Sequence, residues 1–130
     1  MNLAIEAALA SWLRSLDPFE GLAIHTGQSN EEIPGDASAL VVACDTSEAV
    51  GGQLHRATAS ILLTTPAVLD IEHHTALAAA LRTAVYSPTA LDAAFAPAVL
   101  HGAVLLSFSE TQASDRWLTT AQLVLGIAGI

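Results

Sequence analysis

Lysine is absent from the 130-residue chain and arginine occurs four times, against 13 aspartates and glutamates, so the net charge is −9 at pH 7. Such a chain lacks the clustered cations that grip nucleic-acid phosphates. Charged residues of both signs make up only 13%, whereas hydrophobic residues make up 52%. Disordered chains combine low hydrophobicity with high charge. The composition therefore excludes a disordered protein and a nucleic-acid-binding module.

Cysteine is almost absent too. Cys44 is alone, so neither an intramolecular disulfide nor a cysteine metal cluster is possible. It ends an apolar run and precedes Asp45, which predicts a small buried thiol and not a nucleophile. No basic signal-peptide region is present, and the longest uncharged stretch, between Asp92 and Glu110, is shorter than the roughly 20 apolar residues of a spanning helix. We expect a soluble intracellular protein that does not enter a membrane.

The first half of the chain predicts one helix and two strands. Ile5, Leu9, Trp12 and Leu16 share a helical face, and Asp17-Pro18 ends that helix. A polar loop is expected over residues 25–38, a buried strand over 39–44 and a turn over 45–53. In residues 54–65, Ala57, Ala59, Ile61 and Leu63 alternate with Arg56, Thr58, Ser60 and Thr64, which indicates a half-buried strand.

The second half predicts a helix over residues 71–86, capped by Asp70, with a core stripe of His74, Leu77, Leu81 and Val85. Ser87-Pro88 is typical of the start of a short helix. Strands are expected over residues 101–109 and 117–127, joined by a turn over 111–115. The order α-β-β-α-β-β predicts a single α+β domain over 1–130. Its antiparallel or mixed sheet has about four strands, with two main helices on one face.

No residue pattern identifies a catalytic, cofactor or metal site. His73 and His74 are adjacent, and adjacent helical side chains diverge too far to close on one ion. His55 and His101 each open a strand and are candidates to meet across the sheet. Gly27-Gln28-Ser29 lacks the second glycine of a hydrolase nucleophile elbow. We predict no cofactor and no bound metal.

The four arginines divide into two pairs. Arg14 and Arg82 lie in the last helical turns, where a cation interacts favourably with the helix dipole. Arg56 and Arg116 lie on or beside strands and face away from the predicted core. Their ion pairs are either within the subunit or between subunits, and the sequence leaves both alternatives open.

The sequence carries more apolar side chains than one subunit is expected to bury. The second helix carries alanines where charges are expected, and the final strand is apolar on both faces. Monomers seldom expose large apolar patches, and free strand edges invite pairing with another chain. We therefore predict a homo-oligomer. The candidate interface residues come from strands and from the second helix: Arg56, Arg116, Trp117, Leu123, Leu125, Ala76 and Ala80.

The layout resembles the tail-terminator and tail-completion proteins of long-tailed bacteriophages. The resemblance runs through a helix carrying Trp12, a strand ending at residues 59–65 (ASILLTT), a helix containing residues 77–82 (LAAALR) and a hairpin closing at 123–126 (LVLG). It covers nearly the whole chain in length and element order, without a diagnostic motif. It implies a non-enzymatic virion protein that forms a ring, typically sixfold, between the tail tube protein and the head connector protein.

DNA passes through such a ring, and carboxylates repel phosphates. We therefore expect acids of the loops to line the lumen or a docking face: Glu31, Glu32, Asp36, Asp45 and Glu48. Two alternatives stay open. One is a head–tail connector or neck component of the same layout. The other is a small oligomeric enzyme or ligand-binding module with its site between subunits, which a deep pocket lined by His55 or His101 would favour.

Overall fold

The computed structural model describes residues 2–27, 33–34, 36–113 and 115–129. In chain order its elements are α1 (Asn2–Arg14), the 3₁₀ turn η1 (Asp17–Phe19), β1 (Ala23–Thr26), β2 (Ala39–Gly51), β3 (Leu54–Pro66), α2 (Ile71–Val85), α3 (Pro88–Ala94), β4 (Val99–Ala113) and β5 (Arg116–Ala128). Within the described residues, five strands form one sheet in the order β1-β2-β3-β5-β4. β1 pairs with β2 in parallel, and the other pairs are antiparallel. The predicted α+β class is confirmed.

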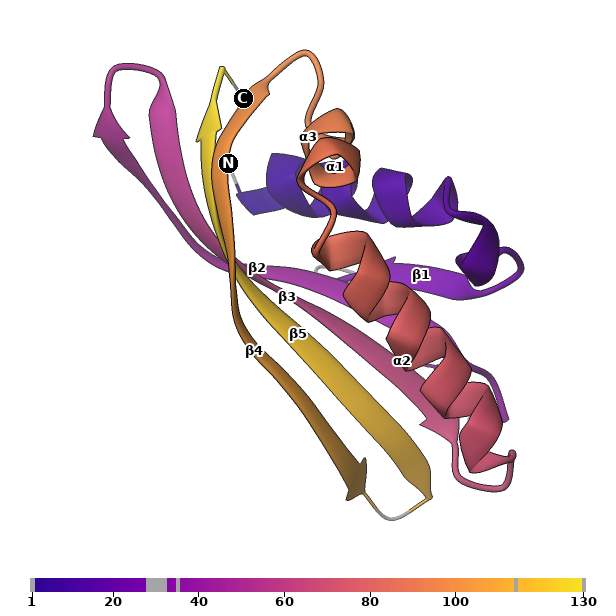
Figure 1. Cartoon of the computed structure of the whole chain (residues 1–130). Coiled ribbons are helices and arrows are strands. Elements are labelled where there is room, and N and C mark those ends of the chain that lie inside the picture. The colour runs from indigo at the N-terminus through magenta and orange to yellow at the C-terminus, as the bar shows by residue number, and fades with distance from the viewer. Residues whose placement is uncertain (1, 28–32, 35, 114, 130) are drawn as a thin grey trace.

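The helices lie together on one face of the strongly twisted sheet (Figure 1). The β2–β3 hairpin extends past the helices at one end of the sheet, and the β4–β5 hairpin extends at the other (Figure 1). No described element covers the opposite sheet face.

The helix boundaries follow the predicted signals. The side chain of Asp70 accepts a hydrogen bond from the backbone N–H of Glu72, and that of Ser87 accepts one from Ala90 at 3.4 Å. Both caps satisfy an N–H that the first helical turn leaves unpaired. The first helix ends at Arg14, and Pro18 lies in the 3₁₀ turn that follows.

The core lies between the helices and one sheet face. Ile5, Leu9 and Leu13 of α1 and Leu81 of α2 are fully buried against strand residues that alternate along β2, β3 and β5. The buried apolar side chains of these three strands include Leu40, Val42, Cys44, Ala57, Ala59, Ile61, Leu63, Ala121, Leu123, Leu125 and Ile127. A single hydrophobic cluster thus includes residues from both halves of the chain.

Two predictions about the strands are corrected. β1 is not among the predicted strands, and its second half falls in the predicted polar loop over residues 25–38. Its parallel pairing with β2 adds a fifth strand and makes the sheet mixed, which is one of the two predicted alternatives. The predicted turn over residues 45–53 is largely strand, because β2 continues to Gly51 beyond a register shift between Cys44 and Thr46. The hairpin turn itself is short and contains Gly52 at φ 56°, a left-handed conformation that glycine adopts without strain.

Candidate interaction surface

The sheet face opposite the helices is open to solvent and is almost free of charge. Residues paired across strands share a face, so Thr58 of β3, Val124 of β5 and Val104 of β4 form one row on this open face. Its described central positions, none of them charged, are Val41, Ala43, Thr46, Thr58, Ser60, Leu62, Thr120, Gln122, Val124, Val104, Ser107 and Ser109.

Charged side chains within these described rows stand only at their ends, and Asp45, which has no cross-strand partner at the register shift of β2, is exposed beside the central rows. Arg56 and Glu48 form one row near the β2–β3 hairpin, and Arg116 lies at the other end of β5. A solvated antiparallel sheet face normally alternates polar and often charged residues outward. Five of the twelve central positions are apolar and the other seven are Ser, Thr or Gln, so the open face is uncharged and presents apolar groups among polar ones.

Partners within the chain are found for both strand arginines. Arg56 donates from Nε to Oε1 of Glu48 at 3.1 Å, and its Nη2 contacts the same oxygen. Arg116 donates from Nε to Oγ1 of Thr64 at 2.6 Å and from Nη2 to the carbonyl of Ala37. Both arginines therefore have interactions inside the subunit, the first as an exposed pair worth about 1 kcal/mol or less.

The other predicted interface residues do not share one surface. Leu123 and Leu125 are 1% and 0% exposed beneath the helices, which corrects their placement on a contact surface: they belong to the subunit's own core. Ala76 is exposed on α2, and Ala80 is half-buried against the core. Trp117 is half-buried, and its Nε1 is buried without a hydrogen-bond partner in the described part of the chain.

The predicted acidic residues are not gathered in one place. Glu31 and Glu32 lie outside the described residues. Asp36 is exposed before β2 begins at Ala39, whereas Glu48 lies nine residues further along that strand, about 30 Å away at roughly 3.3 Å per residue. Asp45 and Glu48 are exposed residues of β2 and not of a loop.

The edge strand β4 is a second unusual surface. It is 15 residues long and pairs on one side only, with β5. Val99, Val104 and Leu106 are 51%, 58% and 56% exposed along it. β4 carries neither lysine nor proline, and register shifts near Gly102 and Ser107 are the described features that interrupt its pairing. Both the open face and this edge therefore leave apolar groups available for contact.

His74 is a structural residue of the helix–sheet boundary. Its Nδ1 lies 2.8 Å from Oγ1 of Thr65, its Nε2 lies 2.7 Å from Oγ1 of Thr119, and all three residues are buried. Burial lowers the pKa of His74, and the smaller effects of Glu110 and His73 oppose each other. His73 is exposed, with its Nε2 3.5 Å from the hydroxyl of Ser38.

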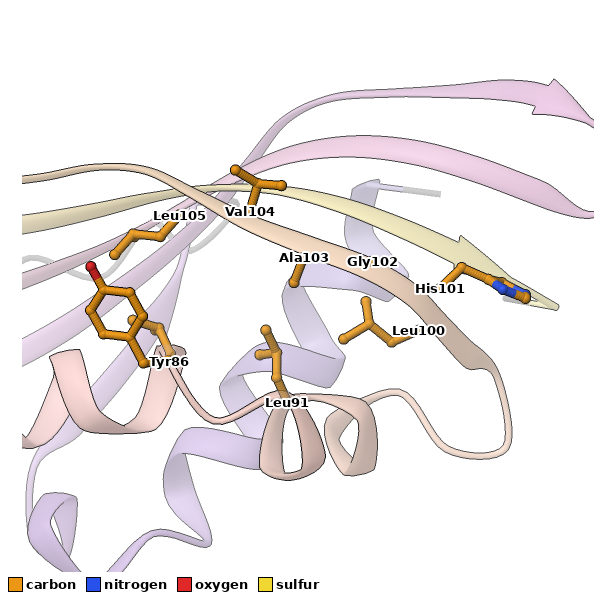
Figure 2. A pocket seen from close by; sticks show the side chains of 9 residues that line it. Tyr86, Leu91, Leu100, His101, Gly102, Ala103, Val104 and Leu105 are labelled. Carbon is orange, nitrogen blue, oxygen red and sulfur yellow. The ribbon is translucent and has the colours of Figure 1, made fainter.

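His55 and His101 do not meet. β5 lies between their strands, and His55 pairs with Ile127. His101 borders a hollow of about 410 Å³ between α2, α3 and β4, lined mainly by apolar side chains such as Tyr86, Leu91 and Leu105. In Figure 2 its imidazole lies at the end of the hollow and points away from Tyr86 and Leu91. His55 borders a second hollow, of about 260 Å³, so each histidine lines a separate hollow.

Cys44 is 6% exposed, as the apolar run predicts. Burial raises the pKa of its thiol, and the carboxylates of Glu6 and Asp45 raise it further. A thiol held protonated in this way is a weak nucleophile. Across the described ranges, no group of three or more histidine, cysteine or acidic residues is arranged to hold a metal ion. The same ranges contain no helix with both the length and the apolar character to cross a membrane.

The fold is shared with solved structures, although no protein-family model and no curated protein matches the chain. One similar structure is a chain of the virion of a native gene transfer agent particle, 17% identical, with a TM-score of 0.68 over 96% of this chain and 95% of that chain. A second is a protein whose name conveys no function, 15% identical, with a TM-score of 0.55 over 98% of this chain and 93% of that chain. At these identities the likeness shows a common fold.

Proposed function

We propose that this chain is a structural subunit of a phage-type virion, and that its place there is a tail-terminator or tail-completion ring. The observation that carries the proposal is the likeness to a chain of a gene transfer agent virion, which extends over nearly the full length of both chains. A match of whole chains is more informative than a shared motif, because it includes the element order and the sheet.

The open sheet face supports an assembling role. It exposes a broad uncharged surface on a protein whose net charge is −9, so contact through this face brings copies together with little repulsion between carboxylates. The proposed assembly is a homo-oligomeric ring, sixfold as in the family that the sequence resembles. Its partners are the tail tube protein on one side and the head connector protein on the other.

The charge balance supports passage of DNA without binding. The chain has no lysine, and two of its four arginines are engaged by Glu48 and by Thr64 with a backbone carbonyl. Exposed acids such as Asp36 and Asp45 repel phosphates wherever they face the DNA path. The proposed role is therefore structural and not catalytic, and its location is the virion.

Disruption of the gene for this chain, in the phage or phage-like genome that carries it, tests the proposal. A terminator is expected to leave heads without attached tails and tails of irregular length, both corrected when the wild-type chain is supplied in trans. Tails of normal length beside unjoined heads would favour a connector or neck component instead. Normal particles in the disrupted strain would contradict both roles.

A further inference from the structure

Two facing glycines leave a hollow in the open sheet face near the β2–β3 hairpin. Gly102 of β4 pairs with Gly126 of β5, and a side chain added at Gly102 would meet nothing within 4 Å. This hollow, which we term the socket, has a volume of about 260 Å³. It is lined mainly by Val50, Leu54, Gly102, Val104, Val124 and Gly126, and His55, Arg56 and Leu125 also border it. In Figure 2 Val104 points away from the helices, to the open side of the sheet.

The socket is suited to apolar side chains. Val104 is 58% exposed and Val50 is 47% exposed, so its walls remain in contact with water in the isolated chain. Its volume falls below the roughly 300–1,000 Å³ of small-molecule sites. One or two aliphatic side chains from another protein segment would cover these walls.

At the far end of β3, the turn into α2 presents such side chains. Val68 is 88% exposed, Leu69 is 41% exposed and Ile71 is 52% exposed; we term these three residues the apolar turn. Backbone hydrogen bonds fix its shape, from Leu69 N to Pro66 O at 3.1 Å and from Ala67 N to Asp115 O at 2.7 Å. A turn held in one conformation loses little freedom on binding.

The socket and the apolar turn cannot meet within one chain. Leu54 begins β3 beside the socket, and Pro66 ends it before the apolar turn, a separation of about 40 Å at roughly 3.3 Å per residue. A contact between them therefore joins two copies through different surfaces. Repeated from copy to copy, such a head-to-tail contact closes a ring or extends a filament.

Charge favours the same pairing. Asp70 and Glu72 are exposed beside the apolar turn, and Arg56, 61% exposed in its side chain, lines the socket. Arg56 uses Nε and Nη2 toward Glu48, whereas a guanidinium carries five N–H donors. It can accept a second carboxylate, which reduces the repulsion between two acidic copies.

We infer that the apolar turn of one copy inserts Val68 and Leu69 into the socket of the next copy, with Asp70 or Glu72 beside that copy's Arg56. The inference rests on the proposed ring and names the contact that builds it. It assigns the exposed valines at both ends of the molecule to one repeated interface.

Disulfide trapping of the full chain tests the contact. In a Cys44→Ala background, the pair Val68→Cys and Val104→Cys is expected to give a ladder of linked dimers, trimers and larger species on mild oxidation, which a reducing agent collapses. The matched control joins Val68→Cys to Ser109→Cys, on the same strand and the same face as Val104 but outside the socket. A disulfide requires Cα atoms within about 7 Å, so the control should form no ladder.

Equal ladders from the two pairs, or none from the Val104 pair at high protein concentration, would overturn the inference. A charge exchange gives a second readout. Arg56→Glu should reduce the Val68–Val104 ladder several-fold, and adding Glu72→Arg should restore it. A ladder unchanged by Arg56→Glu would also count against the contact.

The outcome separates the contact from the proposed function. A chain present in purified particles but without the Val68–Val104 link overturns the contact and leaves the virion role. A chain that forms the ladder but is absent from particles supports the contact and overturns the virion role. A disulfide from Val68→Cys to a different virion protein, in place of the ladder, would assign the apolar turn to that partner and overturn the inference.

Discussion

The Nε2 of His74 lies 2.7 Å from the hydroxyl oxygen of Thr119, and this contact joins α2 to β5 across 45 residues of sequence. The other ring nitrogen is 2.8 Å from the hydroxyl of Thr65 on β3. One neutral imidazole therefore links a helix to two adjacent strands inside the core. The helix layer is fastened to the sheet by a polar contact as well as by apolar packing.

This arrangement predicts that acid weakens the fold through His74. Burial lowers its pKa from the ordinary 6.5, so below about pH 6.5 the unfolded chain binds a proton more readily than the folded chain. The contribution of the neutral His74 side chain to stability is complete above about pH 6.5. It is lost as the pH falls toward the lowered pKa of this residue in the folded state. Urea unfolding at pH 7.5 and 5.5 should show a smaller decrease in stability for His74→Gln than for the wild type. Equal decreases in both proteins would contradict this role.

Truncation of two adjacent residues of β5 should destabilise the fold to different extents. Leu125 is fully buried against the helices, so Leu125→Ala should lower the free energy of unfolding by about 2–5 kcal/mol. Val124 faces the open side, so Val124→Ala should cost less than about 1.5 kcal/mol in the isolated chain. Chemical denaturation of both variants measures the difference. A loss for Val124→Ala as large as that for Leu125→Ala would mean that the two faces are assigned incorrectly.

Arg116 should hold the segment before β2 against the sheet. Its guanidinium donates to Thr64 and to the carbonyl of Ala37, and Nη1 lies 3.4 Å from the carbonyl of Pro34. In Arg116→Met these carbonyls lose a charged donor, and hydrogen exchange of the backbone amides of residues 36–38 should accelerate. Mass spectrometry of the exchanged peptides checks this. The peptide covering α3 serves as the internal control, and equal acceleration there would indicate general destabilisation instead.

A charge placed in the middle of the open face should block assembly. Thr120 lies in an uncharged row with Leu62 and Ser109. Thr120→Lys should leave the chain folded but fail to restore particles in the disrupted strain, because burying an unpaired ammonium group at a protein contact is costly. Thr75→Lys, on the exposed surface of α2, is the matched control and should restore them. Restoration by both variants would exclude the open face as a contact surface.

Much of the fold was predictable because its signals are local. The stripe containing His74 and Leu81 predicts α2, and the alternation from Arg56 to Thr64 predicts the buried and open faces of β3. No local signal predicts β1, because four residues give little periodicity and the strand depends on parallel pairing with β2. The Asp, Ser, Glu and Gly residues within 45–53 favour a turn, yet pairing with β3 extends β2 to Gly51.

The interaction surface was less predictable. Along β5, one step in the sequence moves a side chain from the core to the open face. The apolar pattern therefore does not show that Leu123 and Leu125 are buried while Val124 faces outward. The sequence predicts two main helices on one face of the sheet, and α3 lies on the same side (Figure 1). The socket depends on the register that pairs Gly102 with Gly126, which no local pattern predicts.

Analysis of purified particles tests the central claim most directly. Particles produced from the phage or phage-like genome that carries the gene should be separated on a density gradient, and their proteins quantified by mass spectrometry. Antibody labelling should locate the chain in the electron microscope. The account predicts a fixed, low copy number in every particle, at the junction of head and tail. Purified, DNA-filled, tailed particles that lack the chain would contradict it.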